Sequence, residues 1–178
     1  MNRKLTLDEL NRKSADEFKN TEKHPVHVVL DDIRSAQNVG SVFRTSDAFL
    51  LKKIHICGIT AKPPHKEIKK TALGASDCMD WQYWKSSLEC VNHLKEQNVQ
   101  IISVEQTEES VELQKTEVNP SHENPVAVIF GNEVDGIKEE IIPKSDFCIE
   151  IPQYGTKHSL NISVCAGIAI WEVVRRMI

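Results

Sequence analysis

Long apolar runs are absent from this chain of 178 residues. None approaches the roughly 20 residues that a membrane-spanning helix needs, so we expect no membrane partner. The first residues, MNRKLTLDELNRKSADEF, contain no apolar core followed by a small-residue cleavage site, which argues against a signal peptide. The sequence therefore predicts a cytoplasmic protein.

Paired cysteines are absent as well. The five cysteines are odd in number and form no C-x-x-C pair, and the seven histidines give no H-x-x-x-H pattern. A disulfide framework and a zinc cluster are both disfavoured, so we expect no metal. Most of the cysteines fall in apolar stretches and are typical of small core residues: Cys57, Cys78, Cys90, Cys148 and Cys165.

The chain also lacks a basic surplus and the phosphate-binding glycine motifs. Its net charge is −4 and its pI is near 6.0, whereas proteins that hold nucleic acid by non-specific contacts usually carry excess positive charge. Neither G-x-G-x-x-G nor G-x-x-x-x-G-K-[ST] occurs. Residues 60–70, TAKPPHKEIKK, are nevertheless basic. A local basic surface therefore stays open beside the commoner interpretation, a solvated loop.

What the chain does contain is an alternation of apolar β-rich runs and amphipathic helical runs. Strands that are apolar on both faces and separated by helices predict a mainly parallel sheet with helices on both sides. No internal repeat or linker divides the sequence, so we expect one α/β domain over residues 1–178. The predicted strands cover residues 26–30, 53–58, 99–104, 126–130 and 147–151, and the predicted helices 39–50 and 86–98.

Both ends of the chain are expected to be helical. Residues 1–25 read as an N-terminal helical extension, because Thr6 and Glu9 have the spacing of a capping box. Residues 159–177 are apolar nearly all round from Ile162 to Ile170, which predicts a helix buried on most sides. A subunit interface and the centre of a monomer would both satisfy this pattern.

Unusual polar residues follow three of the predicted strands, at the edge where open parallel sheets bind ligands. Asn38 and Arg44 follow the first strand, and their plain alternatives are a helix cap and a solvated helix face. Glu133 lies between two glycines, where an exposed acid in a strand-to-helix turn is a strong alternative. Ser159 stands where the last helix would be capped. Asn161, just before that apolar helix, needs a hydrogen-bond partner, for which Glu133 and Arg44 are the candidates.

Three segments resemble, in order, the three motifs of the SpoU/TrmH-type RNA 2′-O-ribose methyltransferases of the SPOUT superfamily. They are NVGSVFRTSDAF, IFGNEVDGI and IPQYGTKHSLNISVCAGIAIWE. KTALGA and SVEQTEES also resemble intervening segments of this family. Any one motif is weak, whereas three in the family's order, each after a predicted strand, are a strong signal. The resemblance runs from about Val26 to the C-terminus.

This resemblance implies a C-terminal trefoil knot within residues 100–178, which chain physics alone does not predict. It implies S-adenosylmethionine as the cofactor, bound in a bent conformation on backbone groups of the knot loops. It also implies a homodimer that is formed largely through the last helix. Carried over by position, the cofactor loops contain Val104, Gly131, Ile151, Ser159 and Leu160.

The implied activity is methyl transfer to a ribose 2′-hydroxyl in RNA, with Arg44 as the catalytic residue. A guanidinium hardly loses its proton, so we interpret Arg44 as a cation that stabilises the developing oxyanion and holds an adjacent phosphate. Asn38, Glu133 and Asn161 would form its polar support, with Glu133 pairing with Arg44 or holding Asn161. The glycines beside Glu133 are expected to free the backbone for the cofactor.

The substrate is less well defined. Many relatives carry an extra RNA-binding domain, whereas about 25 residues precede the first strand here, so we expect RNA recognition from this domain or a dimer groove. Because some minimal relatives act on tRNA, tRNA is slightly favoured over rRNA. Two alternatives stay open: a catalytically silent RNA-binding module of the same fold, and an unrelated α/β enzyme for a nucleotide or small molecule. Candidate phosphate-binding residues are Lys62, Lys66, Lys69, Lys70 and Lys157.

Overall fold

A seven-stranded sheet forms the centre of the molecule, in a computed structural model that describes residues 2–6 and 8–178. The strand order is β3-β2-β1-β6-β4-β7-β5, and every neighbouring pair is parallel. The strands are β1 (His24–Asp31), β2 (Leu51–Cys57), β3 (Trp81–Trp84), β4 (Gln100–Val104), β5 (Val111–Glu112), β6 (Val126–Phe130) and β7 (Phe147–Glu150).

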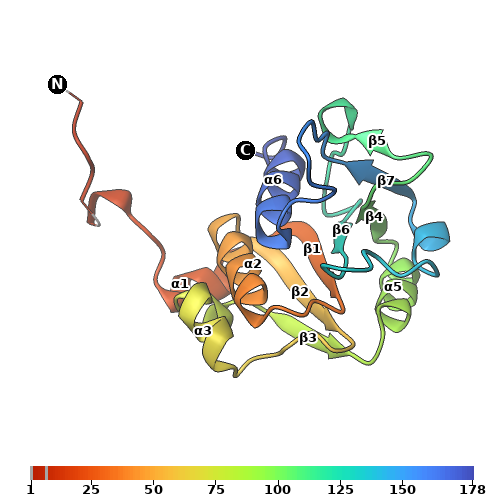
Figure 1. Cartoon of the computed structure of the whole chain (residues 1–178). Helices are drawn as coiled ribbons and strands as arrows, with labels where there is room; N and C mark the ends of the chain where they lie inside the picture. The colour runs from red at the N-terminus through yellow and green to blue at the C-terminus, as the bar shows by residue number, and fades with distance from the viewer. Residues whose placement is uncertain (1, 7) are drawn as a thin grey trace.

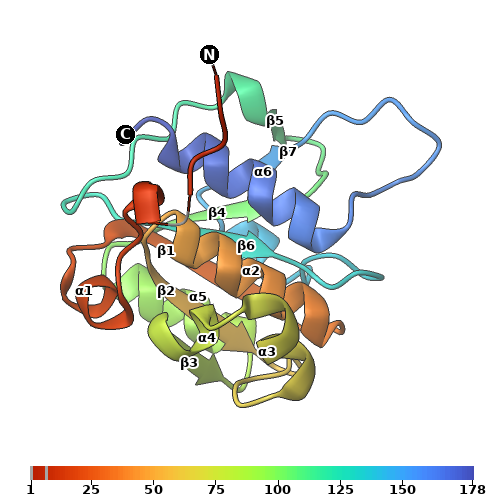
Figure 2. The same ribbon diagram turned by 90° about the vertical axis from the view of Figure 1, so that its left-hand side faces the viewer.

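Helices cover both faces of this sheet (Figure 1). On one face lie α2 (Ala36–Ala48), α3 (Lys66–Ala72) and α6 (Ile162–Val174), and on the other lies α5 (Ser87–Glu96). In Figure 2, α2 and α6 run side by side across the first face, with α3 next to α2. The predicted α/β class with a parallel, helix-covered sheet is confirmed. The remaining short elements are α1 (Ala15–Asn20), α4 (Ala75–Cys78), η1 (Asp8–Leu10), η2 (Leu113–Lys115) and η3 (Ile142–Lys144).

The continuous apolar run of β1 has a direct structural reason. Val28 and Leu30 belong to the larger core cluster, under α2 and α6, while Val29 belongs to the smaller cluster under α5. Successive side chains of a strand point to opposite faces, and both faces are covered here. The strand therefore needs apolar residues at every position rather than at every second one.

Several short elements were not predicted, among them β3, β5, α3 and α4. The basic run of residues 60–70 contains most of α3, in which Ile68 and Ala72 are buried against the core while the lysines face outward. A helix of seven residues with two buried positions is too short for a periodic signal. Such elements are stabilised by the tertiary contacts rather than by their own sequence pattern.

The N-terminal helical extension was predicted only in part. The capping box is made, since Thr6 N donates to Glu9 Oε2 over 2.8 Å and Glu9 N donates to Thr6 Oγ1 over 3.4 Å. However, it opens only the single 3₁₀ turn η1, which stands apart from the sheet in Figure 1. A second capping box, Ser14 with Glu17, opens α1. The segment is therefore two short turns, because few of its side chains have a core to pack against.

The last helix differs from the prediction at its start and in its burial. It begins at Ile162, and the cap is Asn161 rather than Ser159, since Ser163 N donates to Asn161 Oδ1 over 2.9 Å. Within one chain it is not buried on most sides. The side facing away from the core carries Val164, Ile168 and Trp171, which are 50%, 40% and 46% exposed. We call these three residues the α6 stripe.

Across the described residues, the structure contains no helix with the length and apolar character needed to cross a membrane.

Candidate functional site at the carboxyl edge of the sheet

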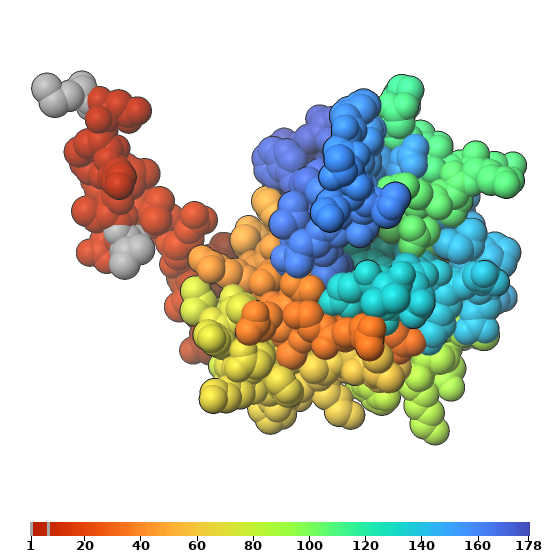
Figure 3. Space-filling view, in the orientation of Figure 1, coloured from red at the N-terminus to blue at the C-terminus, as the bar shows by residue number. Residues whose placement is uncertain are grey.

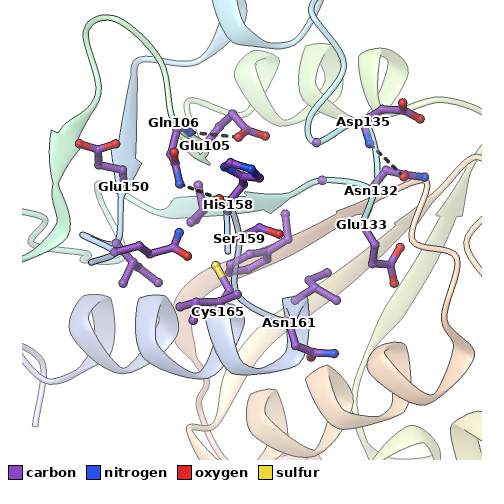
Figure 4. A pocket seen from close by; sticks show the side chains of 18 of the residues that line it. Glu105, Gln106, Asn132, Glu133, Asp135, Glu150, His158, Ser159, Asn161 and Cys165 are labelled. Atoms are coloured by element: carbon purple, nitrogen blue, oxygen red, sulfur yellow. Dashed lines mark hydrogen bonds between the residues drawn. The ribbon is translucent and has the colours of Figure 1, made fainter. Parts of the chain in front are cut away.

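A pocket of about 520 Å³ lies where β4, β6 and β7 end and α6 begins. Figure 3 shows the surface near it, between the segment before α6 and the turn that follows β6. The close view in Figure 4 shows that residues far apart in the sequence meet around this hollow. All five positions predicted for the cofactor line it: Val104, Gly131, Ile151, Ser159 and Leu160. That they bind a cofactor remains a prediction.

The turn after β6 closes on itself. Asn132 N donates to Gly136 O over 2.9 Å and Gly136 N donates to Asn132 O over 3.0 Å, while Asn132 Oδ1 accepts from Val134 N. A Cβ on Gly131 would lie 2.2 Å from the carbonyl carbon of Gly136, which itself has a φ of +71°. The two glycines are therefore required by the turn itself. The expectation that they serve to admit a cofactor is not needed to explain them.

Glu133 points from this turn to the start of α2. Its carboxylate accepts hydrogen bonds from Arg34 N (2.9 Å), Ser35 N (3.2 Å) and Asn38 Nδ2 (3.0 Å). Partial burial acts to raise the pKa of Glu133, but these hydrogen bonds outweigh it and the pKa lies below its ordinary value. An acid at a helix N-terminus is also favoured by the helix dipole. The carboxylate is thus held ionised and aimed at α2.

Asn38 links Glu133 to the last helix. Its side-chain oxygen accepts from Asn161 Nδ2 over 3.3 Å, while its amide donates to Glu133. Three segments, at residues 38, 133 and 161, are therefore joined by a chain of side-chain hydrogen bonds beside the pocket. Glu133 and Asn161 themselves line the pocket. The expected direct contact of Glu133 with Asn161 is replaced by this relay through Asn38.

Arg44 does not join this group within one chain. Its side chain is exposed, makes no hydrogen bond or ion pair with a described residue, and is not among the residues that line the pocket. The predicted pairing of Arg44 with Glu133 or Asn161 is wrong for a single copy. The reason is helical geometry: at about 100° per residue, Arg44 points well away from the face of α2 that carries Asn38.

Several residues of the site were missed by the sequence analysis. Glu105 Oε2 accepts from Ile137 N over 2.9 Å and thereby ties the loop after β4 to the end of the turn after β6. Gln106 Nε2 donates to His158 O over 3.2 Å and ties the same loop to the segment before α6, as the dashed line in Figure 4 shows. The segment SVEQTEES was singled out only because it resembles a family segment, since no residue spacing within it predicts these long-range hydrogen bonds.

The five candidate phosphate-binding lysines are all exposed, but they are spread over two regions. Lys66, Lys69 and Lys70 lie on α3, and Lys62 precedes it with its Nζ 4.0 Å from the centre of the Tyr83 ring. Lys157 lies in the segment before α6 and lines a second, adjoining hollow. Among the described residues, none of the five lines the 520 Å³ pocket.

In the part of the chain that the structure describes, no group of three or more His, Cys, Asp or Glu side chains is placed to hold a metal ion.

Comparison with known proteins decides the family. The sequence profile of the SpoU rRNA Methylase family matches residues 25–171, which is most of the chain. The chain belongs to the SpoU family. The predicted resemblance, from about Val26 onward, is thereby confirmed.

Two curated relatives have names that specify different RNA substrates. The tRNA (guanosine(18)-2′-O)-methyltransferase of Borreliella burgdorferi is 28% identical over 149 residues, which is 84% of this chain and 66% of that protein. The 23S rRNA (guanosine-2′-O-)-methyltransferase RlmB of Vibrio parahaemolyticus is 26% identical over 170 residues, or 94% of this chain and 66% of that protein. The chain thus spans slightly less than two thirds of the length of these relatives.

Solved structures of the SpoU family share the fold. The AdoMet-bound rRNA methyltransferase from Sinorhizobium meliloti superposes with a TM-score of 0.80 at 23% identity, covering 90% of this chain and 60% of that one. At this level of identity the likeness establishes the fold alone.

Proposed function

We propose that the protein transfers a methyl group from S-adenosylmethionine to a ribose 2′-hydroxyl of structured RNA, with tRNA slightly favoured over rRNA. The observation that carries this proposal is that two family motifs, far apart in the sequence, line one pocket at the carboxyl edge of a parallel sheet, while the third is hydrogen-bonded to both of them through Asn38. Membership of the SpoU family and the names of the two curated relatives support it.

The pocket suits the proposed cofactor. Its volume lies within the ordinary range for small-molecule sites, and its apolar lining, with Phe130, Ile149 and Leu160, offers a surface for an aromatic base. Four acidic side chains also line it, and no described lysine or arginine does. A ligand with a sulfonium and an ammonium group matches that charge. The acids are Glu105, Glu133, Asp135 and Glu150.

When bound, S-adenosylmethionine would supply an electrophilic methyl group. The part of this chain is to place and polarise the acceptor. In our proposal Arg44 stabilises negative charge as it develops on the ribose 2′-oxygen and holds an adjacent phosphate, because its guanidinium stays protonated. The hydroxyl proton leaves to phosphate or water. The hydrogen bonds from Asn161 through Asn38 to Glu133 would hold the start of α6 and the turn after β6, which border the pocket, at a fixed separation.

Because Arg44 faces away from the pocket of its own chain, we propose that it acts on the pocket of a second copy. The α6 stripe supports a homodimer, since three neighbouring apolar side chains on one helix face are exposed. α2, which carries Arg44, packs against α6, and the Phe49 and Trp171 rings lie 5.7 Å apart. A copy that packs on the stripe would therefore also face α2.

Three further features belong to this proposal. Residues 1–178 would act as a single domain, in the cytoplasm and without a metal. The segment after residue 100 would be knotted, as the family resemblance implies. A catalytically silent RNA-binding module of the same fold is the alternative. Measuring methyl transfer from labelled S-adenosylmethionine to unmodified tRNA and to unmodified rRNA separates the two, since RNA binding without transfer to either would support the silent module.

The role of Arg44 gives the sharpest test. We expect Arg44→Ala to reduce methyl transfer by at least about a hundredfold, as expected for loss of one group that stabilises an oxyanion, while the cofactor affinity measured by calorimetry is unchanged. Arg12→Ala, which removes another exposed arginine, is the matched control and should transfer normally. Wild-type turnover in Arg44→Ala would remove Arg44 from the mechanism.

A further inference from the structure

The two tyrosines of this chain have very different surroundings. Tyr83 is engaged: its hydroxyl donates to Gly58 O over 3.2 Å and Lys62 Nζ lies over its ring. Tyr154 is 95% exposed and makes no hydrogen bond or ring contact with a described residue. Its ring therefore adds nothing to the packing of a single chain, and a different reason for an aromatic side chain at this position must be sought.

Tyr154 stands over a second hollow. This hollow has a volume of about 400 Å³ and is lined by the segment from Pro152 to Asn161, which we call the β7–α6 loop. Lys157 also lines it. From Tyr154 to Asn161 every residue is exposed, and the loop projects from the body in Figure 2. An aromatic face and a cation are thus presented together on a freely accessible surface.

The second hollow adjoins the first. Gln153, Ser159, Leu160 and Asn161 line both of them. A ligand in the second hollow would therefore be separated from a ligand in the first by a single layer of residues. On the other side of the first pocket, the hydrogen-bonded turn after β6 presents Val134, which is also largely exposed. Each of the two loops that border the pocket thus carries a largely exposed hydrophobic side chain, Tyr154 in one and Val134 in the other.

We propose that the β7–α6 loop binds an unpaired nucleotide of the RNA, with its base stacked on Tyr154 and its phosphate near Lys157. An aromatic ring with a neighbouring cation is the combination by which proteins hold single-stranded RNA. In a duplex both faces of each base are covered by neighbouring bases, so the ring of Tyr154 would have nothing to stack on. The inference deepens the proposed function, on which it rests: the substrate presents its acceptor in a loop or single strand.

The test measures RNA binding, not methyl transfer. The probes are a short single-stranded RNA containing 2-aminopurine and the same strand annealed to its complement, followed by fluorescence quenching and anisotropy. We expect the single strand to bind more tightly than the duplex. Tyr154→Ala should weaken single-strand binding by about 5- to 150-fold, the range measured for one stacked base, whereas Tyr154→Phe should bind like the wild type. Lys157→Gln should lower the slope of log affinity against log salt by about 0.7.

The matched control is His122→Ala, which removes an exposed aromatic ring outside both hollows and should leave RNA affinity unchanged. Unaltered binding by Tyr154→Ala would overturn the inference, as would equal affinity of the wild type for single strand and duplex. So would a changed sedimentation coefficient of Tyr154→Ala in the absence of RNA, because the loop would then be covered by a second copy. If the wild type binds single strands through Tyr154 but methylates no RNA, the proposed function fails while the binding site stands.

Discussion

At the scale of single residues, a hydrogen bond from Trp84 fixes the tautomer of the buried pair His27 and His55. Trp84 Nε1 can only donate, and it donates to His55 Nδ1 over 2.9 Å. The proton of His55 is then on Nε2, which faces His27 Nδ1 at 3.0 Å. Burial, and next the charges of Lys52 and Lys53, lower the pKa of His27 to about 4. Burial, and next His27, lower the pKa of His55 to about 3. Both rings are therefore neutral in the folded protein at neutral pH.

This pair predicts acid sensitivity. In the unfolded chain the two rings titrate near pH 6.5, so the unfolded state binds more protons between that value and the folded pKa values. The stabilisation is fully present above about pH 6.5 and is lost as the pH falls, by up to about 1.4 kcal/mol per pH unit for each ring. Urea unfolding between about pH 7 and about pH 5 measures it. His27→Leu should show a shallower slope than the wild type, whereas replacing the exposed His122 should not. Equal slopes would refute the assignment.

At the scale of elements, side chains at both ends of the turn after β6 bind residues at or just after the end of β1. Glu133 holds the backbone of Arg34 and Ser35. At the other end, Lys138 Nζ lies 2.6 Å from Asp32 Oδ2 and 3.5 Å from Asp31 Oδ1, and the Asp31 side chain is only 1% exposed. The shape of the pocket rim therefore depends on a lysine outside the pocket.

Lys138→Met tests the role of these ion pairs. The change leaves a buried carboxylate without its cation, which should lower the free energy of unfolding by about 2 to 3 kcal/mol and weaken cofactor binding. Lys138→Arg should restore most of both. The control is Lys95→Met, which removes the exposed ion pair of Lys95 with Asp146 and should cost less than about 1 kcal/mol. Equal losses in the two methionine variants, measured by urea unfolding, would show that Lys138 has no special role.

The elements also show how far sequence reasoning reaches. Five strands of the sheet were predictable because they are rich in apolar residues, and Asn38, Glu133 and Asn161 were found because each is polar beside an apolar run. The direction of Arg44 was not predictable from its place in a motif, because it depends on which face of α2 packs on the sheet. The hydrogen bonds of Glu105 and Gln106 join residues 32 and 52 positions apart. Contacts between residues so far apart in the sequence produce no periodic pattern from which they could be predicted.

At the scale of the whole molecule, the α6 stripe and the outward direction of Arg44 point to the same arrangement. One chain carries a pocket and, on α2, an exposed arginine that does not line it. Two copies packed through α6 would cover the stripe and bring α2 of each chain toward the other. On this proposal the dimer is the smallest catalytic unit.

Ile168→Glu tests that arrangement. A charge in the middle of the stripe should convert the dimer to a monomer in sedimentation velocity, because burying an unpaired carboxylate is costly. The monomer should keep its circular dichroism spectrum and lose methyl transfer. Ile59→Glu, which places the same charge on another exposed isoleucine outside α6, should stay dimeric and active. A fully active Ile168→Glu monomer would contradict the proposed action of Arg44 between copies.

The pairing of β1 with β6 has a consequence for how the protein is made. Val26 lies opposite Val126 in this pair, so one side of the earliest strand stays open until a hundred further residues have been synthesised. The core cluster on its face is completed only by Val173 and Val174 of α6. A nascent chain on the ribosome would therefore expose one edge of β1 until β6 has been made, and chaperones that shield unpaired strands would matter most before α6 emerges.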